Sequence, residues 1–395
     1  MVVPCPISNA TPKIKGIKRL GTYSNMEHPT FALAKRVSGL LVLEDGRCFS
    51  GISVGHEGLA TGEVVFNTAS LSYQGILSDP SCAGLIVTMT TPPVGNVGIN
   101  PEDHEFSGTP PIRGFVMREL SSRVSNWRAT ESLPDYLQRH QIVALSEVDT
   151  RSITQHLCLH GTKRGVIASG DWSAEELIQR AKNSPRLEDI EFVEQLTVPE
   201  PVEWTEPLSD TPKPICTKKI VVFDFGVKQS ILRSLVSLGA KVVVVPARTS
   251  AEDVLKYQPD GVLLSNGPGD PARQDDAVAE IAKLSGKVPM FGIAMGHQLL
   301  ARALGVSTRR LKLEHRGTQP VLDKRSGKVA MTSQNHGFCV NAETLPPEIE
   351  ITHTNLHDGT VEGFRHKDLP IFSVQFQPDE RFLNVAYFVE HFLQN

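Results

Sequence analysis

A turn in the second half of the chain has the residue spacing of a site that attacks a carbonyl group. In Gly292-Ile293-Ala294-Met295-Gly296, an apolar strand runs into a helix through a Gly-x-x-x-Gly turn. Such an elbow presents its central side chain at the edge of a sheet and offers the next backbone N–H to an oxyanion, while the helix N-terminus favours negative charge. The central residue is Ala294, whose methyl group can neither attack nor ionise. The turn therefore has the form of a nucleophile site, but the residue at its central position cannot act as a nucleophile.

A second loop offers backbone N–H groups to a ligand. Residues 265–271 read Ser-Asn-Gly-Pro-Gly-Asp-Pro, and Gly267 and Gly269 allow the backbone to approach a ligand closely. The alternative is a tight turn with a purely structural role. Both loops follow predicted strands, and in parallel sheets ligands bind beyond the carboxyl ends of the strands.

The elements that position these loops alternate regularly between strands and helices. The apolar pattern predicts strands at 219–226, 241–247, 261–267 and 288–294, and helices at 227–239, 250–258, 273–286, 295–305 and 382–394. Near-continuous apolar strands alternating with amphipathic helices indicate a parallel sheet covered on both faces. We therefore expect a doubly wound α/β domain over residues 219–395.

The first half of the chain is richer in strands. The pattern predicts strands at 39–46, 48–55, 63–70 and 85–91, followed by helices at 132–141, 149–161 and 173–183. A mixed, β-rich domain is therefore expected over residues 38–190. Residues 191–218 are rich in proline and predict an extended, semi-rigid linker. Residues 1–37 read as a flexible extension, with an organelle transit peptide as the alternative.

Composition argues against several other classes of function. Acidic and basic residues are mixed and the formal net charge is −4, so no surface for nucleic acid is predicted. No apolar run approaches the roughly 20 residues needed to cross a membrane. The six cysteines are scattered without a CxxC pair, which disfavours disulfides or a zinc site and suits a cytoplasmic protein. We expect no metal and no cofactor, and no GxxxxGK[ST] nucleotide loop is present.

Residues 38–380 resemble class I glutamine amidotransferases, and specifically the small subunit of carbamoyl phosphate synthetase. The resemblance is carried by LLVLEDG, GEVVFNTA, YQGILSDPS, RELSSRVSNWRATESLPDYLQRH, DTRSITQHL, LSNGPGDP, TSQNHGF and DGTVEGFRHKDLPIFSVQF. In that family the elbow reads G-I-C-x-G-H-Q, and a His and a Glu in a later H-P-E motif complete a catalytic triad. The cysteine thiolate attacks the amide of glutamine, the histidine transfers protons, and the glutamate orients the imidazole.

The resemblance implies that this triad is degenerate. Ala294 takes the position of the cysteine, Gln377 that of the histidine and Asp379 that of the glutamate. An amide is neither a useful base nor a useful acid near neutral pH, so we expect glutamine hydrolysis to be lost. An alanine at the nucleophile position alone would also fit a variant engineered to trap substrate. Further changes at 380–384, and at 313–315 where the family usually has Phe-Gly-His, favour natural degeneration.

The resemblance also implies ligand-contacting residues, and these are better retained than the triad. The matching positions are Ser81, Gly267, Gly269, Gln298, Asn335, Gly337 and Phe338, while Met295 stands where leucine is usual. A pocket for L-glutamine is one interpretation, and retention for domain stability is the other. Cys82 and Cys339 lie beside these segments, but neither has an identifiable base, so a replacement nucleophile is not expected. His336 lies in the pocket motif, so it is the histidine to test as an alternative general base.

Three functions remain open. The first is a small subunit that does not hydrolyse glutamine, docks through its N-terminal domain on a large subunit, and supports carbamoyl phosphate synthesis from free ammonia. It would serve pyrimidine or arginine synthesis. The second is a glutamine sensor or scaffold outside the synthetase, and the third is an active amidotransferase with another nucleophile. Retention of RELSSRVSNWRATESL, which has no role in glutaminase chemistry, favours the first.

Overall fold

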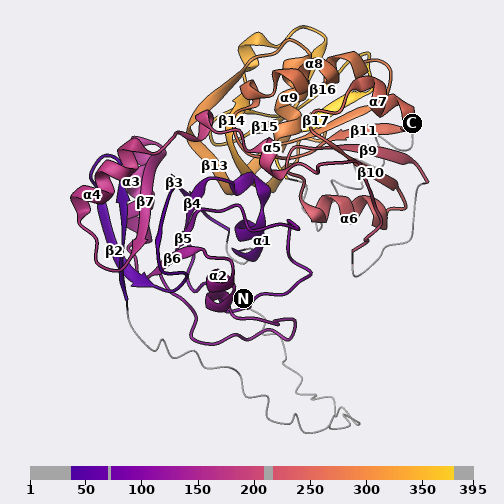
Figure 1. The fold of residues 1–395 in the computed structure, drawn as a ribbon. Helices are drawn as coiled ribbons and strands as arrows, with labels where there is room; N and C mark the ends of the chain where they lie inside the picture. The colour runs from indigo at the N-terminus through magenta and orange to yellow at the C-terminus, as the bar shows by residue number, and fades with distance from the viewer. Residues whose placement is uncertain (1–36, 70–72, 209–216, 378–395) are drawn as a thin grey trace, which may run out of the picture.

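The computed structural model describes residues 37–69, 73–208 and 217–377. The chain forms two halves (Figure 1), which we call the barrel half, up to residue 190, and the sheet half, from residue 191. Residues 1–36 of the extension predicted over residues 1–37, the C-terminal helix predicted at 382–394 and Asp379 lie outside the described residues. Within those residues, no helix is long and apolar enough to cross a membrane.

The barrel half is a closed barrel with the strand order β1-β2-β6-β5-β4-β3-β7. Its strands are β1 (Ser38–Leu43), β2 (Cys48–Ser53), β3 (Leu59–Asn67), β4 (Leu85–Met89), β5 (Gly114–Val116), β6 (Val143–Ser146) and β7 (Lys163–Ser169). Each strand contributes apolar side chains to one buried cluster, among them Leu41, Ile86 and Leu145. Because alternate residues of a strand face the same side of a sheet, this cluster forms the interior of the barrel.

Three helices of the barrel half begin at side chains that cap them. The helices are α1 (Tyr73–Ser78), α2 (Leu133–Arg139), α3 (Thr150–His160) and α4 (Ala174–Asn183). Ser132, Asp149 and Ser173 accept hydrogen bonds from backbone N–H groups in the first turns of α2, α3 and α4. These caps satisfy donors that a helix start would leave free. The helices predicted at 132–141, 149–161 and 173–183 are thereby confirmed.

The sheet half is built on a second sheet in the order β14-β13-β15-β16-β17-β12-β11-β9-β10-β8. Its strands are β8 (Val202–Trp204), β9 (Lys219–Asp224), β10 (Lys241–Pro246), β11 (Gly261–Leu264), β12 (Met290–Ile293), β13 (Thr308–Asp323), β14 (Val329–Val340), β15 (Ile349–Asn355), β16 (Val361–His366) and β17 (Ile371–Val374). Pairing is parallel from β10 through β9, β11 and β12 to β17, and antiparallel beyond. The predicted parallel sheet is therefore confirmed, with an antiparallel extension that joins it at β17.

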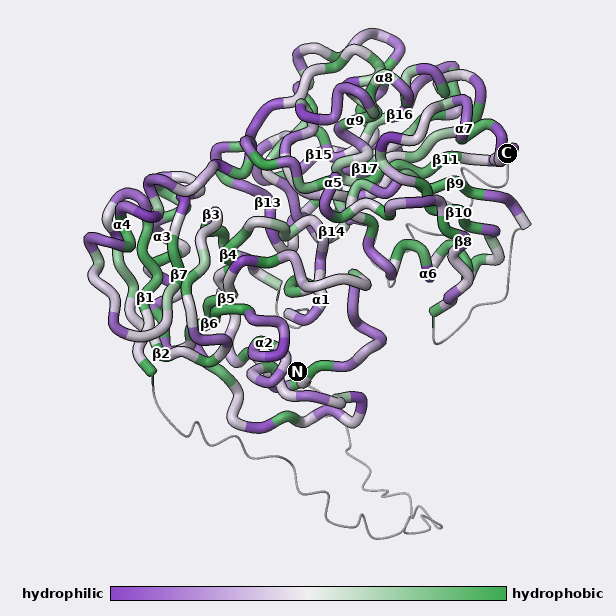
Figure 2. Tube along the Cα trace, viewed as in Figure 1, coloured by the Kyte–Doolittle hydropathy of each residue, from purple (hydrophilic) through white to green (hydrophobic). Residues whose placement is uncertain are grey.

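Helices cover both faces of the parallel strands. They are α5 (Val193–Leu196), α6 (Gln229–Ser237), α7 (Ala251–Lys256), α8 (Asp275–Leu284) and α9 (Met295–Ala303). Val221 and Phe223 of β9 share one buried cluster with α7, α8 and α9, whereas Ile220 and Val222 share another with α6. Figure 2 shows hydrophobic residues along β9 and β10. Burial of alternate residues against opposite layers is the doubly wound arrangement expected for this half.

The proline-rich segment 191–218 contributes structure to the sheet half. It carries α5 and β8, and β8 pairs with β10 at the end of the sheet. The backbone N–H of Val198 also donates to Asp224 Oδ2 at 2.8 Å. The chain therefore adds a strand to the second sheet before entering β9.

Candidate functional site

The elbow between β12 and α9 has a strained backbone at Ala294. Its φ of 51° and ψ of −105° are values that residues with a side chain rarely adopt. Two glycines allow the chain to turn so sharply: a Cβ on Gly292 would lie 2.5 Å from the carbonyl oxygen of Gly296, and a Cβ on Gly296 would lie 2.0 Å from that of Leu264. Ala294 is buried in the cluster that includes Phe376. The turn thus has the elbow geometry, with a methyl group at its centre.

Gln377 follows β17, the strand next to that elbow. β12 and β17 are parallel neighbours with Ile293 opposite Val374, so Ala294 and Gln377 both follow the carboxyl ends of adjacent strands. The side chain of Gln377 is buried. Its Oε1 accepts from Lys228 Nζ at 3.2 Å, and its Nε2 donates to Asp79 Oδ2 at 3.2 Å. Both ends of the amide are therefore engaged by charged groups, and neither end can act as a general base.

A loop of the barrel half reaches into this region. Asp79 caps the 3₁₀ turn Pro80–Cys82 by accepting from Ser81 N at 2.8 Å, and its other oxygen accepts from Asn335 Nδ2 at 2.9 Å. Ser81 Oγ accepts from Asn266 Nδ2 at 2.9 Å. Asn266 belongs to the loop after β11 and Asn335 to β14. Loops from both halves therefore meet beside the elbow.

The other predicted ligand-contacting residues lie in or beside the same region, and several are already engaged. Gln298 on α9 donates to the carbonyl oxygen of Phe338 at 2.8 Å and to Gln375 Oε1 at 3.0 Å. Gly267 packs against the backbone of Phe225, where a Cβ would lie 2.2 Å from the carbonyl oxygen, and Gly269 has a φ of 90°. Met295 belongs to the hydrophobic core. The amide donors of Gln298 are thus used within the protein.

An ion pair that the sequence motifs did not reveal lies at the same place. Arg316 and Glu314 are both buried, with Arg316 Nη2 at 2.6 Å from Glu314 Oε2. Arg316 stands opposite Asn335 across the β13–β14 ladder, and its guanidinium donates to Asn335 Oδ1. In the sequence, Glu314 was noted only because it departs from Phe-Gly-His, and no motif pointed to Arg316 as a site residue. Side chains two residues apart share a face of a strand, and that rule would have paired them.

Neither candidate replacement cysteine has the environment of a nucleophile. Burial, with a contribution from Asp79, raises the pKa of Cys82 to about 12, and Asn335 Nδ2 donates to its sulfur at 3.2 Å. Burial raises the pKa of Cys339 to about 11. The thiolate is the attacking form of cysteine, and both groups are thiols at neutral pH.

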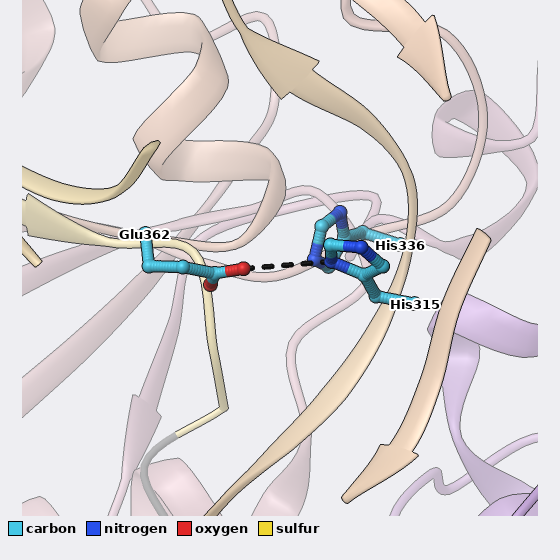
Figure 3. A group of neighbouring side chains, drawn as sticks. All are labelled: His315, His336 and Glu362. Atoms are coloured by element: carbon cyan, nitrogen blue, oxygen red, sulfur yellow. Dashed lines mark ion pairs between the residues drawn. The ribbon is translucent and has the colours of Figure 1, made fainter. Parts of the chain in front are cut away.

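His336 lies with His315 and Glu362 in a buried group (Figure 3), with one possible ligand atom of each within 4.8 Å of the others. Burial lowers the pKa of His336 to about 4, which makes it a poor base at neutral pH. Burial also lowers the pKa of His315, but its hydrogen bonds to Glu362 and Asp358 and their charges outweigh this, so the net shift is upward. His315 Nδ1 lies 3.5 Å from Glu362 Oε1, and His315 Nε2 lies 3.0 Å from Asp358 Oδ2. The buried carboxylate of Glu362 thus has the imidazole of His315 as a neighbour that is an ion-pair partner when protonated.

Comparison with known proteins matches both halves. The family described as carbamoyl-phosphate synthase small chain, CPSase domain, matches residues 41–167, and glutamine amidotransferase class-I matches residues 221–382. The carbamoyl phosphate synthase small chain of Syntrophotalea carbinolica is 47% identical over 350 residues, covering 87% of this chain and 93% of the relative. That of Akkermansia muciniphila is 48% identical over 345 residues, covering 86% and 92%.

Proposed function

Because the chain belongs to the carbamoyl phosphate synthase small chain family, we propose that it is a small subunit that cannot hydrolyse glutamine. The observation that carries the proposal is Ala294 at the centre of an elbow that keeps its strained geometry. Covalent catalysis needs a group that can attack the amide carbon and later leave, and a methyl group does neither. Gln377 supports the proposal, because its amide accepts from Lys228 and donates to Asp79.

The partner in this proposal is the large subunit of carbamoyl phosphate synthetase, which would use free ammonia. The barrel half is the docking side that the family resemblance implies. Trp127 supports this choice, because its side chain is 93% exposed within the retained segment RELSSRVSNWRATESL. Tryptophan is enriched among the residues that contribute most to protein–protein binding. In this role the chain stabilises or regulates its partner and supplies no ammonia.

The test compares ammonia release from glutamine with carbamoyl phosphate synthesis from ammonium, using the full chain alone and with its cognate large subunit. We expect the two chains to co-purify, ammonium to support synthesis, and glutamine to support none. Release of ammonia from glutamine by the unmodified chain would contradict the proposal, and Cys82 and Cys339 would then be replaced next. Failure to co-purify would instead favour a sensor or scaffold outside the synthetase.

Variants at the elbow sharpen this test. Ala294→Cys restores the nucleophile, and Ala294→Cys/Gln377→His adds a base beside it. Both are made together with Glu314→Gly/Arg316→Ala, which removes the side chains that lie against Gly337 and Asn335. On this background the protein with both the cysteine and the histidine should hydrolyse more glutamine than the protein with the cysteine alone. Ala301→Cys on the same background is the matched control, because Ala301 is also a buried alanine but lies within α9 and not in the elbow. Activity in the Ala301→Cys protein equal to that of the protein with both the cysteine and the histidine would show that hydrolysis does not depend on the elbow.

A further inference from the structure

We propose that the site expected to hold L-glutamine is filled by Glu314 and Arg316 of the chain itself, so that free glutamine is excluded. The inference rests on the proposed function, and it concerns the binding of glutamine instead of its hydrolysis. Three of the predicted glutamine contacts, Asn335, Gly337 and Phe338, follow one another closely on β14. Their neighbour across the ladder is β13, which carries both Glu314 and Arg316.

The carboxylate of Glu314 occupies the space above Gly337. A Cβ placed on Gly337 would lie 2.7 Å from Glu314 Oε1 and 2.9 Å from its Cδ. Glycine at a ligand site leaves room for the ligand to approach the backbone, and here a side chain of the protein takes that room.

The guanidinium of Arg316 engages the second predicted contact. It donates to Asn335 Oδ1, while Asn335 Nδ2 donates to Asp79 and to the sulfur of Cys82. An amide side chain has one carbonyl acceptor and one NH₂ donor group, and both are used here. Asn335 therefore has to break contacts within the protein before it can bind the polar groups of glutamine.

Burial makes these two side chains hard to displace. Glu314 and Arg316 are each 4% exposed, and the Nε and Nη2 atoms of Arg316 lie 2.7 and 2.6 Å from Glu314 Oε2. Separating a buried ion pair leaves an uncompensated charge in a medium of low polarity. Glutamine is a zwitterion, and it would have to replace this pair while adding two charges of its own to the same buried space.

The barrel half holds the filling group in place. Arg310, also on β13, lies 2.6 Å from Glu63 and 2.9 Å from Glu188, both in the barrel half, and 3.6 Å from Glu314. Asp79 holds Asn335 from the same side. The space expected to hold the ligand is thus occupied by contacts that connect the two halves.

The test measures L-glutamine binding by isothermal titration calorimetry on the full chain, with D-glutamine as the non-cognate probe. We expect no detectable binding to the unmodified chain and at least a tenfold gain in affinity for Glu314→Gly/Arg316→Ala. The control is Glu350→Gly/Arg365→Ala, which removes an exposed ion pair between β15 and β16 of the same sheet, and it should gain nothing.

Hydrogen exchange of residues 333–338 in the unmodified chain gives a readout that does not depend on the variants. Saturating L-glutamine should leave exchange in this segment unchanged. Protection of the segment, or calorimetric binding by the unmodified chain, would overturn the inference. The proposed function is judged by other results, namely ammonia release from glutamine and co-purification with the large subunit. A folded double variant that gains no binding would also overturn the inference.

Discussion

Ala294 retains the backbone of a reactive residue without its chemistry. Conformations of this kind cost on the order of 1–3 kcal/mol and persist only where the surroundings impose them. Here the surroundings are the close approach of Gly292 to Gly296 and of Gly296 to Leu264. The side chain itself is an ordinary buried methyl group beside Phe376. The turn therefore remains as part of the packing between β12 and α9.

Gly296→Ala tests how strongly this turn is imposed. The added methyl group would meet the backbone of Leu264, which cannot rotate away, so we expect the free energy of unfolding to fall by about 1–3 kcal/mol. Urea unfolding of both proteins measures the difference. Gly75→Ala is the matched control, because a Cβ at this helical glycine of α1 meets nothing within 4 Å. An equal effect of the two substitutions would mean that the elbow is not tightly packed.

At the scale of elements, the packing of α9 against β17 predicts a loss of stability in acid. His297 of α9 is fully buried, and its Nδ1 lies 2.7 Å from Ser373 Oγ of β17. Its Nε2 has no partner within the described residues. Burial, with a contribution from His353, lowers the pKa of His297 to about 3. In the unfolded chain His297 therefore takes up a proton near pH 6.5, whereas in the folded chain it stays neutral down to a much lower pH.

The contribution of His297 to the free energy of unfolding should accordingly be largest above about pH 6.5. It should fall as the pH is lowered toward the pKa of His297 in the folded protein, by up to about 1.4 kcal/mol per pH unit. His297→Asn keeps a polar group toward Ser373 but cannot titrate, so its unfolding free energy should depend less on pH between 6.5 and 4. Urea titrations at several pH values compare the two proteins. His357→Asn is the control, because His357 is exposed and its ring forms only a surface hydrogen bond with Gln319 among the contacts of the described residues. Parallel pH curves for the His297→Asn and unmodified proteins would contradict the prediction.

Sequence patterns predicted many of the helices and the strands β9 to β12, but they did not give β5 to β7, the long strands β13 and β14, or the partner of any strand. The α4 helix was predictable from Ser173 and from apolar residues that recur as Leu177 and Ala181, and β12 from its continuous apolar run. Closure of the barrel depends on β7 pairing with both β1 and β3, and no local pattern encodes that choice. The same limit applies at the site, because the position of Ala294 follows from the motif, while the contact of Arg316 with Asn335 needs the register of β13 and β14.

At the scale of the whole molecule, the two halves are joined by charged groups that are partly buried. Lys228 of the sheet half lies 3.2 Å from Glu105 of the barrel half and also donates to Gln377. Arg310 of β13 meets Glu63 of β3, and Figure 1 shows β13 reaching the barrel half. Ion pairs of this kind hold fixed geometry, because each partner would be costly to leave alone in a buried place. We therefore expect the halves to behave as one unit.

Arg310→Ala tests this joint, because it leaves the 5% exposed side chain of Glu63 without its cation. Loss of a partner from a buried charged group costs about 1–3 kcal/mol, so urea unfolding at pH 7 should show a loss of that size. Burial and the charge of Glu314 already raise the pKa of Glu63 against the opposing effect of Arg310. Without Arg310 that pKa rises further, and protonation at pH 5 should recover part of the loss. Arg139→Ala, which breaks a pair with Glu131 at a 57% exposed arginine, should cost less at both pH values. A loss that does not shrink at pH 5 would mean that Arg310 acts by packing and not by its charge.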